Sequence, residues 1–479
     1  MEKSGGKRLL KLKGKDFAAR LNTAVILVVI IAIIAFVNII ADKLPWSYDM
    51  TMDKVYTLTE QTHKVVNGLT KPVNITAFYK EGSEDATVKA LLDQYKKAAR
   101  GKINVSFVDA EKNPAAARKL DPKNEGLAND SIVFESGGRI KKLSGYEIYT
   151  MNEYGLGKSF NGEQMFTGAI KYVTSDKLPK AYFLEGHQEA TVGDDMFKLK
   201  SRIEGDAQTV ETLNLLNAGS VPKDADIVVV ASPKRDLSAE EAKMLKDYLS
   251  KGGKAFFLFD ILSKDQLPNF SALLKDYGVI LKNNFVVEED KQSYFSDNQA
   301  LVLPGLMDHD ILSKLKQQKL EVLFPYPENI EIAKDLDDTL TVEPLLRSTD
   351  KSWIRYNVGD STPTKTKDDL QGPATLAVAV TKSNAEQHYN NTKIVVTGSA
   401  LFINDKMVDM QGNYDFFMNA MNWIEDRKDA ISISPKLLNT DRMFIKGVQY
   451  IILMVVSILV LPIIAFGAGL FVWMRRRHL

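Results

Sequence analysis

The chain has 479 residues, of which 26% are charged, and its formal net charge is +1. This length can hold two or three domains, and the balanced charge does not provide the basic surface of a nucleic-acid-binding protein. The sequence contains no cysteine, which excludes disulfides, cysteine nucleophiles, thiolate metal sites and CxxC redox chemistry. Its five histidines form no HxxxH or HExxH pair, so we expect neither a metal site nor a cofactor.

Two uncharged apolar segments, residues 21–41 and 448–474, are predicted to be transmembrane helices. Each is long enough to cross a hydrocarbon core of about 30 Å, and each is apolar on all faces, unlike a core helix. The first segment has no small-x-small cleavage site, which favours an uncleaved anchor over a signal peptide. The flanking tails, residues 1–20 and 475–479, are basic, so both are predicted to be cytoplasmic. The region between the spans would then lie outside the cytoplasmic membrane.

The juxtamembrane segment 42–70 includes a predicted short helix that Thr59 caps. After it, residues 71–150 read as alternating strands and helices. The predicted elements are a strand at 73–79, a helix at 86–100, a strand at 103–108, a short helix at 114–120, and a hairpin with strands at 131–134 and 139–143. This β-α-β-α-β-β order is similar to a thioredoxin-like domain. Without the cysteine pair, the likeness implies no redox activity.

A linker is predicted at residues 151–179. It contains the sequence GLGKS at 155–159, which is similar to part of a phosphate-binding loop. A complete Walker A motif requires glycine at position 152, where this chain has asparagine. No apolar strand leads into the segment either, so nucleotide binding is not expected.

The second predicted domain spans residues 180–430 and contains the clearest unit in the chain. The apolar strand 226–231, the helix that starts at a Ser238–Glu241 capping box, and the strand 254–259 form a βαβ crossover. Further strands are predicted at 181–184, 209–213, 374–380 and 393–397, and helices at 196–203 and 413–423. We expect an open parallel sheet of flavodoxin or amidotransferase type. Residues 290–370 look like an insertion, and 431–447 form the second juxtamembrane segment.

Several polar residues follow the predicted strands at the carboxyl edge of this sheet, where open α/β sheets bind ligands. They are His187, Glu189, Ser232, Asp260, Asn404 and Asp405. His187 could contact a ligand or act as a general base. Alternatively, it and Glu189 could hydrogen-bond neighbouring loops, and the remaining residues could cap loops. Ser232 lacks a GxSxG elbow and an assignable histidine partner, so no catalytic residue is assigned.

The order and spacing of several motifs resemble the GldG-type proteins, a family of ABC transporter auxiliary components named from bacterial gliding motility. The motifs are YDMTMDKVYTLTEQT at 48–62, FNGEQ at 160–164, EGHQE at 185–189, TGSALF at 397–402 and GNYDFFMN at 412–419 with Trp423. The resemblance covers nearly the whole chain, including both apolar segments. At position 188 glutamine replaces the second glycine of the family's GHGE stretch.

The resemblance implies a non-catalytic auxiliary subunit in the cell membrane, with both termini cytoplasmic and the main domains outside. Its implied partners are an ABC permease, a cytoplasmic ATPase, membrane lipid and an unidentified external ligand, and no nucleic acid. The second domain would be an amidotransferase-like module used for binding. Two alternatives stay open, namely a membrane-anchored solute- or glycan-binding protein and a membrane-anchored hydrolase.

Overall fold

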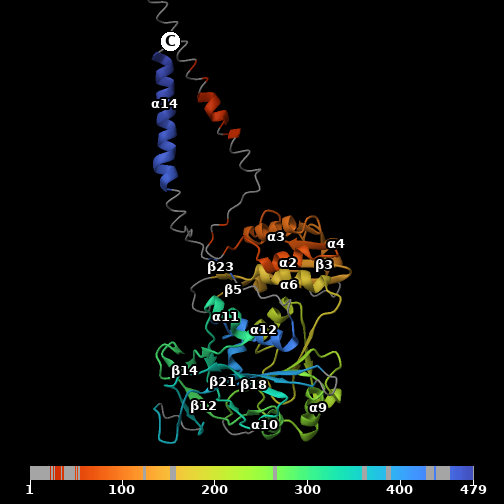
Figure 1. Cartoon of the computed structure of the whole chain (residues 1–479). Coiled ribbons are helices and arrows are strands. Elements are labelled where there is room, and N and C mark those ends of the chain that lie inside the picture. Colours follow the sequence, from red (N-terminus) through yellow and green to blue (C-terminus); the bar gives the residue numbers. More distant parts are fainter. Residues whose placement is uncertain are drawn as a thin grey trace, which may run out of the picture. The chain divides into compact units, whose positions relative to one another are not determined.

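The computed structural model describes residues 49–477 except 50, 52–53, 122–125, 152–157, 263–266, 359–363, 385–389, 428–435 and 439–453, together with helical residues between 22 and 36 (Figure 1). The chain divides into two compact units. One comprises residues 1–50 and 447–479, and the other comprises residues 51–446. The motif GLGKS falls mostly outside the described residues.

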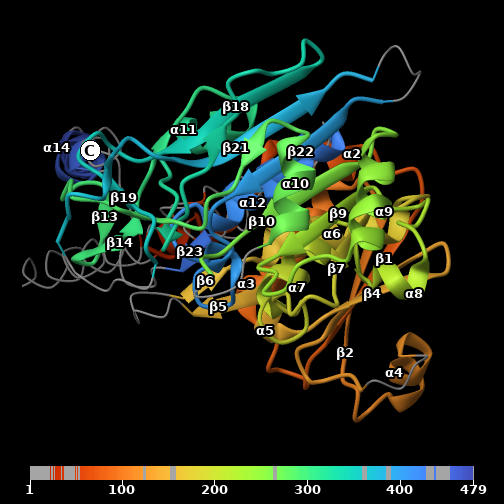
Figure 2. The ribbon, with the colours of Figure 1, turned by 90° about the horizontal axis from the view of Figure 1, so that it is seen from below.

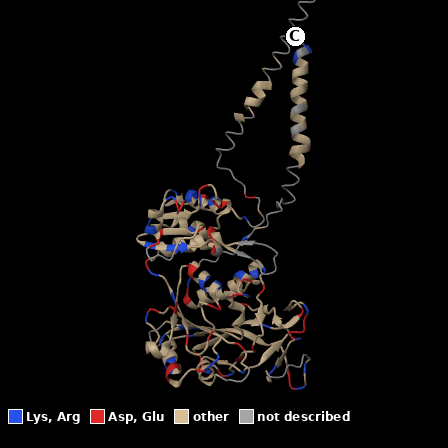
Figure 3. Ribbon diagram, turned by 180° about the vertical axis from the view of Figure 1, so that it is seen from behind, with Lys and Arg blue, Asp and Glu red and all other residues tan. Residues whose placement is uncertain are grey.

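The first unit contains one described helix that is long and apolar enough to cross a membrane. It spans Val456–Arg475, with a mean hydropathy of 2.4 and no buried residues. Within this span, a π-helical turn, Val456–Val460, precedes α14, Leu461–Arg477. Figure 3 shows that α14 carries basic residues only at its C-terminal end. Much of the predicted span 21–41 lies outside the described residues; those described, such as 27–33, are helical and exposed.

The first module of the larger unit, residues 54–175, is built on a four-stranded sheet in the order β2-β1-β3-β4. β1 and β2 are parallel, whereas β3 is antiparallel to both β1 and β4. The side chain of Thr59 caps α2, as predicted. The elements are α2 Glu60–Asn67, β1 Val73–Phe78, α3 Ala86–Ala98, β2 Ile103–Val108, α4 Pro114–Leu120, β3 Ile132–Ser136, β4 Arg139–Leu143, α5 Gly145–Ile148, β5 Tyr149–Met151, β6 Lys158–Phe160 and α6 Gly162–Thr174.

Helix α6 lies within the region predicted as a linker, and most of its residues are buried. Phe166, Ala169 and Ile170 pack in the core of the first module. On its other side, the Gln164 amide donates a hydrogen bond of 2.6 Å to the Tyr414 hydroxyl in the second module. A side chain at Gly168 would place its Cβ 1.3 Å from the Gly205 carbonyl oxygen, so α6 and α7, Phe197–Gly205, touch backbone to backbone. The helix therefore joins the two modules as a shared core element.

The second module, residues 179–427, is built on an eight-stranded sheet in the order β15-β18-β21-β22-β10-β9-β7-β8 (Figure 2). β8, β7, β9, β10 and β22 are mutually parallel. The strands are β7 Lys180–Leu184, β8 Thr209–Leu213, β9 Ile227–Ala231, β10 Lys254–Leu258, β15 Gly305–Leu306, β18 Leu340–Arg347, β21 Thr375–Lys382 and β22 Thr392–Thr397. The predicted βαβ crossover is present, with the Ser238–Glu241 capping box at the start of α9.

Alternate residues along these strands feed two separate cores, as strand geometry requires. Phe183, Val229 and Phe256 pack on one face against α7, α11 and α12. Val228, Val230 and Phe257 pack on the opposite face against α9 and α10. All five residues of β9 are buried, which explains its unbroken apolar sequence. The helices are α7 Phe197–Gly205, α8 Leu215–Ala218, α9 Ala239–Leu249, α10 Pro268–Lys275, α11 Asp310–Gln318 and α12 Asn413–Glu425.

The sheet is mixed, and the prediction of a wholly parallel sheet was wrong at one edge. β21 is antiparallel to β22, and β18 and β15 continue this antiparallel edge. β18 belongs to the region that looked like an insertion. β15 and helix α11 lie in the same region. The remaining strands of this module form small sheets, some of them with strands that precede residue 290, and they are β11 Val279–Ile280, β12 Phe285–Val287, β13 Tyr294–Phe295, β14 Asn298–Val302, β16 Phe324–Pro325, β17 Glu331–Ile332, β19 Trp353–Arg355 and β20 Leu370–Gln371. Overall, the large unit is a mixed α/β structure.

The contact between Gly168 and Gly205 predicts a steric test of the junction between the modules. We expect Gly168→Ala to lower the free energy of unfolding by about 1–3 kcal/mol or more, because the backbone of α7 must move. Gly193→Ala is the matched control, since a Cβ at Gly193 meets nothing within 4 Å. Thermal and denaturant unfolding of the two full-length variants would measure the difference. Equal stability would show that α6 and α7 do not pack this closely.

Candidate functional site

The parallel part of the sheet has a topological switch point between β7 and β9. The chain runs from β7 to β8 on one side of β7, and then returns to place β9 on the other side. In open α/β sheets the crevice at such a switch point is the usual ligand site. Here the loop after β7 and the loop after β9 lie across this crevice and hydrogen-bond to each other. The amides of Lys234 and Arg235 donate to the His187 carbonyl, each at 2.9 Å, and the Ala190 amide donates to the Ala231 carbonyl at 2.9 Å.

The His187 side chain is held between two carboxylates and is only 6% exposed. Its Nδ1 lies 2.9 Å from Glu189 Oε1, and its Nε2 lies 3.2 Å from Glu241 Oε2. Glu189 also accepts the His187 backbone N–H at 2.7 Å, and the ring of Phe270 lies edge-on to the imidazole. Both ring nitrogens are thus engaged, so His187 has no free nitrogen with which to accept a proton from a substrate.

Electrostatics favour the charged form of this histidine. The hydrogen bond to Glu189 raises the pKa of His187 above its usual value, and the hydrogen bond to Glu241 adds to this effect against the opposing effect of burial. Burial would raise the pKa of Glu241, but hydrogen bonds from Ser238 and His187 outweigh it and hold the pKa below its usual value. The cluster is an ion-paired lock that joins the loop after β7 to the start of α9.

Ser232 and Asp260, both at strand ends, meet as the predicted carboxyl-edge arrangement requires. The Ser232 hydroxyl donates to Asp260 Oδ2, and Lys234 Nζ lies 2.6 Å from the same hydroxyl and 3.5 Å from Asp260 Oδ2. Asp260 Oδ1 accepts the Ala400 amide at 2.7 Å. Ser232 has a φ of 56°, the left-handed conformation that a turn directly after a strand can require.

This geometry supports a structural role for Ser232, in which it links two loops, better than a role as a nucleophile. A serine nucleophile needs a base that takes its proton, and a third group that holds this base in the correct orientation. The proton of Ser232 instead points to a carboxylate, which is a weak base, while the neighbouring Lys234 ammonium is compensated by Asp260. His187 is engaged in its own pair of carboxylates. Ser232, Lys234 and Asp260 are in contact with one another, but they do not form the acid–base relay of a hydrolase.

Asn404 and Asp405 lie elsewhere and cap local structure. The Asn404 side chain accepts the amides of Lys406 and Met407, each at 2.9 Å. Asp405 Oδ1 accepts the Lys198 amide at 2.8 Å in the first turn of α7. A carboxylate at a helix start satisfies an amide that has no partner within the helix. Of the predicted residues, the structure therefore brings together His187 with Glu189, and Ser232 with Asp260, while Asn404 and Asp405 have capping geometry.

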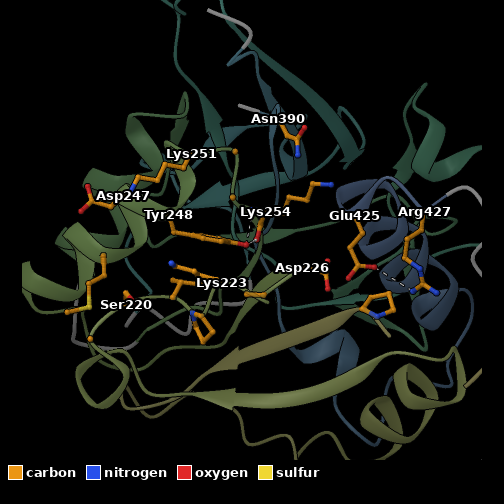
Figure 4. Close-up of a pocket in the computed structure, with 18 residues that line it drawn as sticks. Ser220, Lys223, Asp226, Asp247, Tyr248, Lys251, Lys254, Asn390, Glu425 and Arg427 are labelled. Atoms are coloured by element: carbon orange, nitrogen blue, oxygen red, sulfur yellow. Dashed lines mark hydrogen bonds and ion pairs between the residues drawn. The ribbon is translucent and has the colours of Figure 1, made fainter. Parts of the chain in front are cut away.

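A cavity of about 800 Å³ lies at the opposite, amino edge of the sheet. Figure 4 shows its wall, including Lys223, Tyr248, Lys254, Glu425 and Arg427. Burial raises the pKa of Glu425 to about 7, although the Arg427 guanidinium 3.5 Å away opposes this. Lys254 is paired with Asp426 at 2.7 Å. Glu425 and Arg427 pair with each other, and the rest of the wall carries both lysine and aspartate side chains. The lining therefore does not favour one sign of ligand charge.

Sequence reasoning missed three residues that shape the carboxyl edge. Glu241 was expected only to cap α9, yet it also holds His187. Lys234 followed a strand but carried no motif, and Glu328 lay in an irregular region without any periodic pattern. Of the three, only Glu241 stood in a recognised motif, the capping box. Its 4% exposure in the structure indicates that a further partner must compensate the carboxylate. Among the described residues, no three His, Asp or Glu side chains are grouped to hold a metal ion.

Comparison with protein families gives a match over half of the chain. A family model described as an ABC-type uncharacterized transport system matches residues 178–423. A second model, described as a domain of unknown function, matches residues 52–147. An uncharacterized protein of Borreliella burgdorferi is 20% identical over 95% of this chain and 98% of its own length.

Shorter similarities involve intraflagellar transport proteins. The intraflagellar transport protein 52 homolog of Homo sapiens is 31% identical over 84 residues, which are 17% of this chain and 19% of that protein. This chain thus matches only about a fifth of the length of that relative. Among solved structures, the mmIFT52 N-terminal domain is 19% identical, with a TM-score of 0.38, and the match covers 53% of this chain and all of that domain.

The raised pKa of His187 predicts how the lock responds to pH. Because the folded-state pKa lies above the usual value of about 6.5, the stabilisation is fully present below that pH and is lost as the pH rises through the folded-state value. We expect His187→Gln, neutral at every pH, to destabilise the protein by about 1–3 kcal/mol near pH 6 and by less near pH 9. Denaturant unfolding at the two pH values would measure both differences.

His63→Gln is the control for this test, because His63 is exposed on α2. It should change the stability little, and equally, at both pH values. A loss for His187→Gln that is the same at pH 6 and pH 9 would contradict a charged His187 between the two glutamates.

Proposed function

The chain belongs to the ABC-type uncharacterized transport system family, as the sequence resemblance predicted, and we propose that it is a non-catalytic auxiliary subunit of an ABC transporter complex. In this proposal it couples a permease and its cytoplasmic ATPase to a ligand or partner outside the membrane. ATP hydrolysis takes place in the other subunit, because the sequence has no complete Walker A motif. The engaged side chains at the switch point support a binding or mechanical role over hydrolysis.

The proposed topology has two membrane anchors, residues 21–41 and 448–474, with both termini in the cytoplasm. The apolar helix Val456–Arg475 supports the second anchor, and the basic residues outside each apolar segment support the orientation. Residues 42–447 would then face the extracytoplasmic side. In the ribbon of Figure 3, acidic and basic residues are interspersed along this part of the chain, a pattern that suits a protein region exposed to water.

We also propose specific fold relationships for the two modules. The strand order β2-β1-β3-β4 with one parallel and two antiparallel pairings supports a thioredoxin-like first module, which without cysteine serves as a scaffold. The order β8-β7-β9-β10-β22 supports a flavodoxin- or amidotransferase-like second module. The corresponding domain limits are residues 71–150 and 180–430, and α6 from the intervening segment packs between them.

The observation that carries the coupling proposal is a buried clasp near both ends of the large unit. β23, Lys436–Leu438, pairs antiparallel with β6, so a segment close to the second anchor in sequence returns to the first module. Lys436 Nζ lies 2.6 Å from Glu163 Oε2, with exposed fractions of 8% and 2%. The same ammonium donates to the carbonyls of Lys54 at 2.9 Å and Thr57 at 2.7 Å.

The clasp thereby ties the segment that follows the first apolar stretch to the segment that precedes the second one. Glu163 strengthens the tie, since its other oxygen accepts the Thr59 amide at 2.5 Å and the Thr62 hydroxyl at 2.7 Å. A buried ion pair with these additional hydrogen bonds is specific in its geometry. Relative motion of the two anchors within a permease complex would act first on the clasp. It would then be transmitted through α6 to the second module.

The complex itself can be tested directly. We expect tagged full-length protein, solubilised in mild detergent, to co-purify with an ABC permease and an ATPase that mass spectrometry identifies. The control is a known ABC complex carried through the same membranes and detergent. Recovery of this protein alone, while the control complex stays intact, would contradict the auxiliary-subunit proposal.

The clasp predicts a large effect of a single substitution. Lys436→Met leaves the Glu163 carboxylate buried without its counter-charge, so we expect a loss of about 3–5 kcal/mol in the free energy of unfolding. Lys246→Met is the matched control, since Lys246 pairs with Asp276 at an exposed site and such pairs contribute about 0–1 kcal/mol. Denaturant unfolding of both variants would measure the losses.

A disulfide between β6 and β23 can test whether coupling needs the clasp to be closed or needs the Lys436–Glu163 ion pair itself. Ser159 and Leu437 are directly opposite each other in the β6–β23 pair, and the chain has no other cysteine that could mispair. We expect the Lys436→Met variant to lose the permease in the co-purification experiment, because the clasp opens. Ser159→Cys with Leu437→Cys should restore co-purification in this background after oxidation, but not after reduction. Equal recovery in both redox states would show that the clasp plays no part in coupling.

A further inference from the structure

A second, smaller cavity lies at the carboxyl edge of the sheet, beyond the ends of β10 and β22. Its volume is about 330 Å³, at the lower end of the range of small-molecule sites. Much of its wall is apolar, from Phe259, Leu262, Leu267, Pro268 and Leu281. Its polar groups come from Asp260, Ser271, Lys282, Asn283 and Glu328. This combination of an apolar wall and a few polar groups is typical of a specific ligand pocket.

Glu328 is the unusual member of this wall. The residue is 3% exposed, and its Oε1 accepts the amides of Lys282 at 2.7 Å and Asn283 at 2.5 Å. Its Oε2 has no hydrogen-bond or ion-pair partner among the described residues. Burial raises the pKa of Glu328 to about 7, against the lowering effect of the two amides. A buried carboxylate without a counter-charge is costly, and Glu328 is one of the residues that line the cavity.

The other polar groups leave that oxygen as the main recognition element. Asp260 is already engaged with Ser232, Lys234 and the Ala400 amide, and Asn283 exchanges two hydrogen bonds with the backbone of Leu262. Lys282 lies 3.7 Å from Glu331, which is half exposed. The Ser271 hydroxyl makes no side-chain hydrogen bond within the described part of the chain. Glu328 Oε2 and Ser271 Oγ are therefore the groups available to a ligand.

We propose that this cavity, with the Glu328 carboxylate in its wall, binds a small organic cation that has an ammonium group and a compact apolar body. The ammonium would supply the counter-charge that Glu328 lacks among the described residues, and the apolar body would contact Phe259, Leu262 and Leu267. The free Ser271 hydroxyl can accept a second N–H from the ammonium group. This proposal goes beyond the coupling role and does not depend on it.

Two other occupants fit less well. A divalent metal ion needs several oxygen ligands, whereas only one carboxylate oxygen and one hydroxyl are free here, and no metal-binding group of three occurs among the described residues. An anionic ligand would be repelled by Glu328 and Asp260. If the cavity holds only water, the protein will not distinguish one solute from another. The experiment must therefore compare a cation with neutral and anionic compounds of similar shape.

The probe is benzylammonium, compared with benzyl alcohol and benzoate at equal ionic strength. The purified full-length protein in detergent is used at mildly alkaline pH, where Glu328 is ionised, and no permease is needed. Since a ligand that binds only the folded state raises the melting temperature, we expect a dose-dependent rise with benzylammonium and none with the other two compounds. No rise with benzylammonium, or an equal rise with benzyl alcohol, would overturn the proposal.

Three variants locate the site. Glu328→Gln should abolish the rise, while its amide oxygen can still accept the two backbone N–H groups, so the fold should persist. Glu331→Gln is the control, because it removes a nearby half-exposed carboxylate and should keep the full rise. Ser271→Leu should abolish the rise by filling the cavity with Glu328 intact, which provides a second test if Glu328→Gln does not fold. A full rise in a folded Glu328→Gln or in Ser271→Leu would place the binding elsewhere and overturn the proposal.

Discussion

The carboxylate of Glu163 sets the main constraint on the large unit, because a charge with only 2% exposure must be compensated from within the protein. Its partners come from segments far apart in sequence, namely Thr59 and Thr62 around the start of α2 and Lys436 in β23. None of these partners can leave without stranding a buried polar group. The ends of the large unit are thus fixed to α6 by electrostatics as well as by packing.

Helix α6 turns this local constraint into a property of the whole unit. Tyr95 donates to the Glu163 carbonyl on one side, Gln164 donates to Tyr414 on another, and Gly168 lets the backbone of α7 approach directly. Close-packed interfaces of this kind respond to force by moving as bodies rather than by yielding gradually. A displacement applied at the clasp would accordingly reach the second module through α6, which is the physical basis of the proposed coupling.

The sequence predicted well those features that depend on neighbouring residues. The Thr59 cap, the Ser238–Glu241 box and the apolar strand β9 are local signals, and the structure contains them. The antiparallel edge formed by β21 and β18 was missed although part of its signal is local, because β21 ends at Lys382 and β22 begins at Thr392, too close for the crossover that a parallel pair needs. The pairs His187–Glu241 and Lys436–Glu163 were missed because each joins elements that only the completed fold brings together.

The two sites at the carboxyl edge differ in what the protein leaves unsatisfied. At the switch point between β7 and β9, the side chains of His187 and Ser232 are hydrogen-bonded to other side chains. A ligand would therefore have to displace these interactions. Two strands further along, Glu328 lines a cavity, and its Oε2 has no partner among the described residues. A cation bound there, as we propose, would gain a charge-assisted hydrogen bond without breaking an interaction between these side chains. The proposed binding site therefore lies not at the crevice that the topology of the sheet suggests, but beside it, at a buried carboxylate that has no counter-charge among the described residues.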